Sequence, residues 1–186
     1  MKHGFIRVAA ATPHIRLADC SYNGDQLIKI IDDAEKNDIK LLAFPELCVT
    51  GYTCGDLFFQ DALLNNAKEQ VKKIADFTKH KDIVTLIGFP FEYRGNLYNT
   101  AAVIQGGKIL GLVPKMNIPN YWEFYELRYF TPGHNEIIKV DFLGEEVYFG
   151  SKLLFECKNI PDFVLGVEIC EDLWVPLSPG IFHCLA

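Results

Sequence analysis

The fold is decided by residues 41–46, which read Leu-Leu-Ala-Phe-Pro-Glu. A short apolar run stopped by a proline predicts a buried strand over Leu41–Phe44, since proline cannot donate to a β-ladder. A carboxylate, Glu46, follows at once. In open α/β sheets the reacting groups gather beyond the carboxyl ends of the strands, so Glu46 is a candidate general base. The alternative is a solvated glutamate that merely follows a strand.

Two amphipathic helices flank this strand in the sequence. Apolar residues recur at helical spacing over 24–37, with Asn23 as the expected N-cap, and again from about 62 to 80. Strands are predicted at Phe5–Ala11, Leu41–Phe44, Ile83–Phe89, Leu97–Gln105, Lys108–Val113, Ile137–Phe142, Glu145–Phe149 and Phe163–Ile169. The early alternation of strand and helix favours parallel pairing, whereas the glycine pair at 106–107 predicts an antiparallel hairpin. We therefore expect one α/β domain with a mixed sheet.

The composition excludes several classes of protein. The 186 residues are 49% hydrophobic and carry a formal net charge of −6, which is unlike a disordered chain and argues against a nucleic-acid or membrane surface. No apolar run approaches the roughly 20 residues that cross a bilayer, and the first residues do not resemble a secretory signal. The cysteines form no Cys-x-x-Cys pair, and no Cys or His pair has zinc-like spacing. We expect a cytoplasmic protein with reduced thiols and no metal.

Two other predicted strands also end in reactive residues. Lys115 follows Pro114 after one strand, and Cys170 follows Ile169 after another. A strand–turn–helix step at Cys170 would present the thiol at a sharp corner, where the next backbone N–H groups lower its pKa and can bind an oxyanion. Singly, the lysine is more often solvated and the cysteine more often inert. Together with Glu46, they supply a nucleophile, a proton shuttle and a cation, which suits amide hydrolysis.

These residues stand in motifs that resemble those of a known family. The blocks are Phe44-Pro45-Glu46-Leu47, Pro114-Lys115-x-x-Ile118-Pro119-Asn120-Tyr121 and Ile169-Cys170-Glu171-Asp172. They are similar to the three signature blocks of the carbon–nitrogen hydrolase (nitrilase) superfamily. Finer features at 51–58, 118–133 and 170–174 resemble the glutaminase domain that belongs to glutamine-dependent NAD⁺ synthetases. The resemblance covers the whole chain.

The resemblance implies a catalytic role for each matching residue. Cys170 would attack the side-chain amide of glutamine and form a thioester, and Glu46 would carry the protons. Lys115 and the backbone N–H after Cys170 would hold the oxyanion. Glu126 would be the supporting carboxylate that orients the lysine, with Glu123 as the fallback.

The same resemblance implies the substrate contacts and the partners. Tyr121 and Glu171 would contact glutamine, while Tyr52 and Trp174 would line the pocket, although such aromatics are more often core or rim residues. The ammonia would serve NAD⁺ synthesis from deamido-NAD⁺. ATP and deamido-NAD⁺ would bind an absent synthetase domain, so no cofactor is expected on residues 1–186. The implied fold is an αββα sandwich that assembles into homo-oligomers.

The apolar last residues suggest that this domain is C-terminally truncated, with residues 1–186 forming a partial glutaminase domain. Two other readings stay open at this point. One is a free-standing amidase or carbamoylase of the same superfamily that acts on a small amide. The other is a non-catalytic fragment or interaction module, because a domain cut before its final strands leaves apolar surface unpaired.

Overall fold

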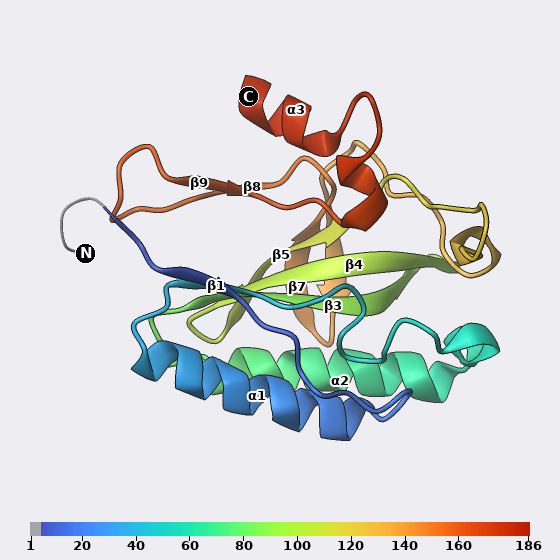
Figure 1. Cartoon of the computed structure of the whole chain (residues 1–186), viewed down its shortest axis with the longest axis horizontal. Coiled ribbons are helices and arrows are strands. Elements are labelled where there is room, and N and C mark those ends of the chain that lie inside the picture. The colour runs from blue at the N-terminus through green and yellow to red at the C-terminus, as the bar shows by residue number, and fades with distance from the viewer. Residues whose placement is uncertain (1–4) are drawn as a thin grey trace.

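Two helices cover one face of a seven-stranded sheet in the computed structural model, which describes residues 5–186 (Figure 1). The strands of this main sheet are β1 (Val8–Ala10), β2 (Leu41–Ala43), β3 (Val84–Tyr93), β4 (Asn96–Gln105), β5 (Lys108–Pro114), β6 (Ile138–Phe142) and β7 (Glu145–Phe149). Its spatial order is β1-β2-β3-β4-β5-β7-β6. Parallel pairs join β1 to β2, β2 to β3 and β5 to β7, and the other neighbours are antiparallel. The prediction of an α/β fold with a mixed sheet is confirmed.

The helical layer consists of α1 (Cys20–Lys36) and α2 (Asp61–Phe77), which follow β1 and β2 in the chain. Their apolar faces and the sheet share the larger hydrophobic core, which includes Leu27, Ile31, Val71 and Ile74. Burial of these faces is what fixes the helices on the sheet. None of the helices within residues 5–186 combines the length and apolar character that a membrane span requires.

The predicted start of the first helix is wrong by four residues. The helix begins at Cys20, and Asp19 caps it by accepting a hydrogen bond from the backbone N–H of Tyr22 at 3.0 Å. Asn23 is instead completely buried, where its side chain bonds the N–H and C=O of Arg16 and the C=O of Val49 at 2.7, 2.8 and 2.9 Å. It therefore ties the loop before α1 to the turn after β2.

The other face of the main sheet carries a second, smaller sheet. Here β8 (Leu154–Glu156) and β9 (Val164–Gly166) pair antiparallel, and the short helix α3 (Pro179–Leu185) lies beyond them (Figure 1). A separate apolar cluster that includes Val103, Val113, Leu153 and Ile169 joins the two sheets. The layers run helix, sheet, sheet, helix, in agreement with a nitrilase-like αββα arrangement.

The predicted last strand is longer than the observed one. Only Val164–Gly166 of the expected Phe163–Ile169 strand forms the ladder, and it lies in the second sheet. Neither β8 nor α3 was predicted, since three-residue strands and a seven-residue helix give little periodicity. The other predicted strands and helices differ from the observed ones mainly at their ends.

Replacing Asn23 with alanine should destabilise the protein by about 3 kcal/mol, because it leaves buried backbone groups of Arg16 and Val49 without partners. Chemical denaturation would measure this loss. The matched control is Asn65→Ala on the exposed face of α2, which should change the unfolding free energy by less than about 0.5 kcal/mol. Equal effects of the two substitutions would contradict the role given to Asn23.

Candidate active site

Glu46 lies in a tight turn that begins where β2 ends. Leu47, the next residue, is buried and has a φ of 51°, in the left-handed region that non-glycine residues rarely adopt. The turn is pressed against Gly88 of β3. A Cβ atom at Gly88 would lie 2.5 Å from the Leu47 nitrogen and 2.7 Å from the Pro45 oxygen. The absence of a side chain at Gly88 is thus what allows the Glu46 turn to pack on the sheet.

Lys115 follows directly after β5 and is completely buried. Its backbone N–H donates to the C=O of Asn99 at 2.8 Å, which continues the β4–β5 ladder by one residue. Its Nζ donates to Oε1 of Glu46 at 2.7 Å, and to Oε1 and Oε2 of Glu126 at 2.8 and 2.9 Å. A buried ammonium is tolerated only when it is paired in this way.

Glu126 begins a short 3₁₀ helix, η2 (Glu126–Arg128), and is only 4% exposed. Besides Lys115, it accepts a hydrogen bond from the Tyr52 hydroxyl at 2.6 Å. Glu123, the fallback for the supporting carboxylate, is exposed and makes no such contact. The structure therefore places Glu126 rather than Glu123 beside the lysine.

Cys170 comes from the smaller sheet, four residues after β9 ends. It is exposed and has a φ of 49°, and it begins the 3₁₀ helix η3 (Cys170–Leu173). The predicted sharp corner at the thiol is thus present, although it opens a single 3₁₀ turn rather than an α-helix. A cysteine in the left-handed region is strained, and such strain is typical of functional sites.

Asp172 connects this corner to the lysine segment. It is 1% exposed and accepts hydrogen bonds from the backbone N–H groups of Ile169, Met116 and Asn117 at distances of 3.2, 3.1 and 2.7 Å. A carboxylate that accepts several backbone N–H bonds makes strong, charge-assisted contacts. Asp172 thereby couples the position of Cys170 to that of Lys115.

The electrostatics of the site differ from the prediction at Cys170. Although the residue as a whole is exposed, partial desolvation of its thiol, followed by the negative charge of Glu46, raises the pKa of the Cys170 thiol above its ordinary value, while Lys115 acts in the opposite direction. The predicted lowering of this pKa is therefore wrong, because desolvation and the nearby carboxylates determine its direction. A thiol with a raised pKa needs a base to remove its proton during attack.

Lys115 stays charged in this environment. Burial alone would lower the pKa of its ammonium, but attraction to Glu46 and hydrogen bonds to Glu126 and Glu46 outweigh that effect and raise the pKa overall. The pKa of the Tyr52 hydroxyl is also raised, first by burial and then by its bond to Glu126. The cluster therefore contains a fixed positive charge and a neutral phenol donor at neutral pH.

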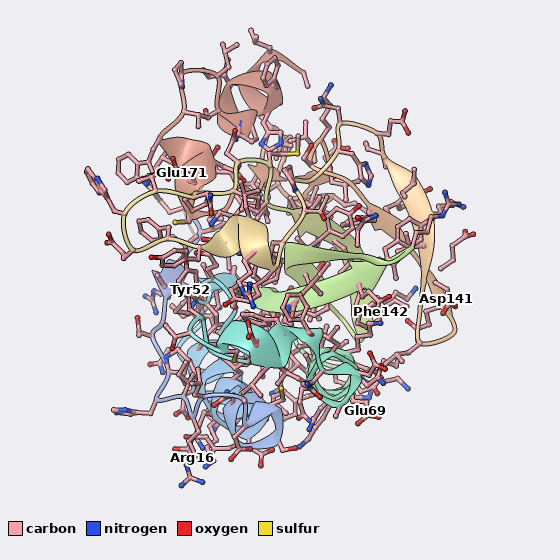
Figure 2. All side chains as sticks on the ribbon, turned by 90° about the vertical axis from the view of Figure 1, so that its right-hand side faces the viewer. Arg16, Tyr52, Glu69, Asp141, Phe142 and Glu171 are labelled. Carbon is pink, nitrogen blue, oxygen red and sulfur yellow. The ribbon has the colours of Figure 1, made fainter. Side chains whose placement is uncertain are left out.

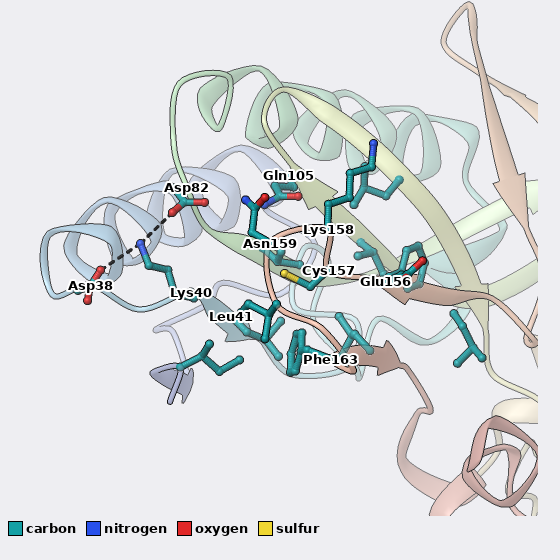
Figure 3. A pocket seen from close by; sticks show the side chains of 18 residues that line it. Asp38, Lys40, Leu41, Asp82, Gln105, Glu156, Cys157, Lys158, Asn159 and Phe163 are labelled. Atoms are coloured by element: carbon teal, nitrogen blue, oxygen red, sulfur yellow. Dashed lines mark hydrogen bonds and ion pairs between the residues drawn. The ribbon is translucent and has the colours of Figure 1, made fainter. Parts of the chain in front are cut away.

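Glu46, Asn99 and Cys170 line the same cleft, which has a volume of about 240 Å³. A larger hollow of about 910 Å³ lies elsewhere, between the main sheet and the β8–β9 layer (Figure 3). Lys40, which pairs with Asp38 at 3.0 Å and with Asp82 at 2.9 Å, is one of its lining residues. None of the three predicted catalytic residues lines the larger hollow. Glu46 and Cys170 line the smaller cleft, and the buried Lys115 is bonded to Glu46 without lining it, so the smaller cleft is the candidate site.

The four predicted substrate-contact residues lie outside the lining of this cleft. Tyr121 donates to Oε2 of Glu171 at 2.8 Å, and this bond raises the pKa of the Tyr121 hydroxyl. Tyr52 and Glu171 lie on the same side of the molecule, with Tyr52 nearer the main sheet (Figure 2). Trp174 is 74% exposed, and its role as a pocket wall stays a prediction.

Three residues of the site were missed by the sequence reasoning. Asp172 and Gly88 act through backbone contacts, which no local pattern reveals. Asn99 could have been suspected, because it is a polar amide in the middle of a strand whose neighbouring residues are largely apolar. Within residues 5–186 no group of three or more His, Cys, Asp or Glu side chains is arranged to hold a metal ion.

The chain belongs to the carbon-nitrogen hydrolase family, whose model matches residues 7–181. Among its relatives is a glutamine-dependent NAD⁺ synthetase of Mycobacterium bovis, 39% identical over 187 residues, an alignment that covers 100% of this chain and 27% of the relative. A crystal structure of a glutamine-dependent NAD⁺ synthetase from Cytophaga hutchinsonii superposes with a TM-score of 0.82 and 30% identity, covering 89% of this chain and 28% of the other. These findings confirm the resemblance that the motifs indicate.

An amidase from Nesterenkonia is more distant. It superposes with a TM-score of 0.61 at 20% identity, covering 80% of this chain and 56% of the amidase, and this likeness extends to the fold alone. The share covered is lower among the synthetases: the chain spans only 27% of the Mycobacterium bovis relative and 28% of the Cytophaga hutchinsonii chain.

The rate of Cys170 alkylation by iodoacetamide should reach half its maximum at a pH above about 8.5, which is the ordinary pKa of a cysteine thiol. The reason is that the folded protein disfavours the thiolate. Glu46→Gln should move this midpoint to lower pH, because it removes the negative charge that opposes ionisation. Peptide mass spectrometry of the Cys170 peptide over a pH series would measure both midpoints. Glu123→Gln, at an exposed glutamate, should leave the midpoint in place; an equal shift there would contradict the assignment.

Gly88→Ala should displace the Glu46 turn and destabilise the protein by about 1–3 kcal/mol through steric overlap. The pH midpoint of Cys170 alkylation should then fall, as is expected for Glu46→Gln. The control is Gly95→Ala in the β3–β4 hairpin, where a Cβ atom meets nothing within 4 Å but φ is 75°. That substitution should cost about 1–2 kcal/mol through backbone strain and leave the midpoint unchanged. If the alkylation midpoint shifted in both Gly88→Ala and Gly95→Ala, the loss of stability alone would explain the shift.

Proposed function

We propose that this chain carries the glutaminase site of a glutamine-dependent NAD⁺ synthetase. The site would hydrolyse the side-chain amide of glutamine and release ammonia for NAD⁺ synthesis from deamido-NAD⁺. One observation carries the proposal: the buried Lys115 lies between Glu46 and Glu126, and Glu46 shares a cleft with Cys170. The names of the relatives support glutamine as the substrate.

In the first half of the proposed reaction, Sγ of Cys170 attacks the carbonyl carbon of the amide while Glu46 takes the thiol proton. The carbonyl oxygen becomes negatively charged and is stabilised by the Lys115 ammonium and the backbone N–H of Glu171. When the C–N bond breaks, Glu46 returns its proton to the leaving nitrogen, which departs as ammonia. A thioester on Cys170 is left.

In the second half, water attacks the thioester carbonyl and Glu46 takes a proton from that water. The same cation and backbone N–H stabilise the second oxyanion. Breakage of the C–S bond then releases glutamate, and the proton returns to the Cys170 sulfur. Because the pKa of Cys170 is raised, the thiol is a reasonable resting state between turnovers.

Recognition of glutamine is assigned to the rim. Glu171, with Tyr121 bonded to it, supplies a carboxylate for the α-amino group of the substrate, while Tyr52 and Trp174 add aromatic surface. Trp174 would then have to close over the ligand, since it is largely exposed.

The remaining partners of the proposed enzyme lie outside residues 1–186. ATP and deamido-NAD⁺ would bind a synthetase domain of the complete protein, and the ammonia would pass to that domain. Assembly into homo-oligomers completes the proposal on the strength of the family resemblance, and the free cysteines support a cytoplasmic location.

Cys170→Ala in the complete protein should abolish ammonia release from glutamine, lowering the rate by at least about 10⁴-fold, because no other group can form the thioester. A coupled glutamate dehydrogenase assay would measure the ammonia. Cys157→Ala, a partly buried thiol outside the cleft, should retain the wild-type rate.

The same assay separates the alternatives. Release from propionamide in preference to glutamine would favour a free-standing amidase. Equal ammonia release by Cys170→Ala and wild type would refute the nucleophile assignment. No release from any amide would favour a non-catalytic module.

A further inference from the structure

Asn99 touches the charged groups of the candidate site from a single position in β4. Its backbone C=O accepts from the N–H of Lys115 at 2.8 Å. Its side-chain Nδ2 lies 2.5 Å from Oε1 of Glu46 and 3.4 Å from Oε2 of Glu126. One residue thus contacts the backbone of the lysine and both of its carboxylate partners.

Asn99 is buried, and one of its polar atoms has no hydrogen-bond partner among the described residues. The residue is 1% exposed, and its Oδ1 is among the buried polar atoms that find no partner in residues 5–186. A buried unpaired carbonyl oxygen costs free energy, and such exceptions call for a functional explanation. The amide orientation is fixed by chemistry, because turning Oδ1 toward Glu46 would set an acceptor against an acceptor.

The position of Asn99 in β4 directs its side chain toward the face of the sheet that carries the cleft. Side chains alternate between the faces of β4, so Asn99 shares a face with Ala101 and Val103. Those two residues belong to the cluster that joins the two sheets, and Asn99 and Ala101 both line the Cys170 cleft. An apolar residue would satisfy packing at this position, but it would offer no donor to the carboxylates.

We propose that Asn99 is a positioning residue for the Glu46–Lys115–Glu126 cluster. This inference rests on the proposed function. Oε1 of Glu46 is held by Lys115 and Asn99, and the Glu46 carboxylate also interacts with the Cys170 thiol. Asn99 therefore fixes the rotation of the Glu46 carboxylate and leaves Oε2 as the oxygen that accepts the Cys170 proton. The neutral Asn99 amide also donates to Glu46 and Glu126, two carboxylates that share a single ammonium.

Two substitutions in the complete protein test this role. Asn99→Leu keeps the branching at Cγ and removes the donor, and Asn99→Asp keeps the shape but adds a negative charge. Both should lower kcat for glutamine about 100-fold, within the range expected for general acid–base catalysis, with little change in KM. In Asn99→Asp the acid limb of the pH–rate profile should also move up by about one pH unit, because the added charge favours proton binding by the cluster.

The matched control is Asn96→Asp, which makes the same change at an exposed position of the same strand. Its kcat and pH profile should equal those of the wild type. Thermal unfolding of all variants separates a folding defect from a catalytic one. If Asn99→Asp does not fold, the kcat of the uncharged Asn99→Leu still decides the question.

Cys170 alkylation by iodoacetamide provides a readout that does not need turnover. In Asn99→Asp its midpoint should rise, because a further negative charge disfavours the thiolate, whereas Asn96→Asp should leave it unchanged. Wild-type kcat and an unchanged alkylation midpoint in both Asn99 variants would overturn the positioning role while leaving the proposed function intact. A wild-type protein that releases no ammonia, with a shifted midpoint in Asn99→Asp, would instead reject the function and retain the placement of Asn99.

Discussion

The buried ammonium of Lys115 is the constraint on which the site depends. Removing a charge from water costs several kcal/mol, and breaking a buried pair costs about 3–5 kcal/mol. Lys115 can occupy its position only because Glu46 and Glu126 both meet it there. The fold must therefore bring three segments to one point: the turn after β2, the end of β5 and η2.

Backbone geometry makes that convergence possible. Gly88 lets the Glu46 turn approach the sheet, and Asp172 ties the Cys170 corner to the segment after Lys115. Two residues at the site, Leu47 and Cys170, adopt positive φ angles that their side chains disfavour. The surrounding contacts must outweigh this strain, as is common where a protein preorganises a reactive group.

Much of this arrangement could be predicted from local patterns. The run Leu41–Phe44 and the helical spacing over 24–37 are strong signals, because burial imposes its period directly on the residues. Glu46, Lys115 and Cys170 were identified because each follows an apolar run at a turn. The start of α1 was misplaced because Asn23 has the chemistry of an N-cap, yet it is used in a buried network with Arg16 and Val49.

The sequence by itself determined the α/β class, the three reactive residue types and their positions after apolar segments, since these depend on short-range periodicity and on side-chain chemistry. Only the tertiary structure decided that Cys170 follows a strand of a second sheet, that its pKa is raised, and that Asn99 bonds the carboxylates. The physical reason is that burial and electrostatic interaction depend on distances between segments far apart in the chain, such as the 69 residues between Glu46 and Lys115. Those distances are set by tertiary packing and cannot be predicted from local sequence patterns.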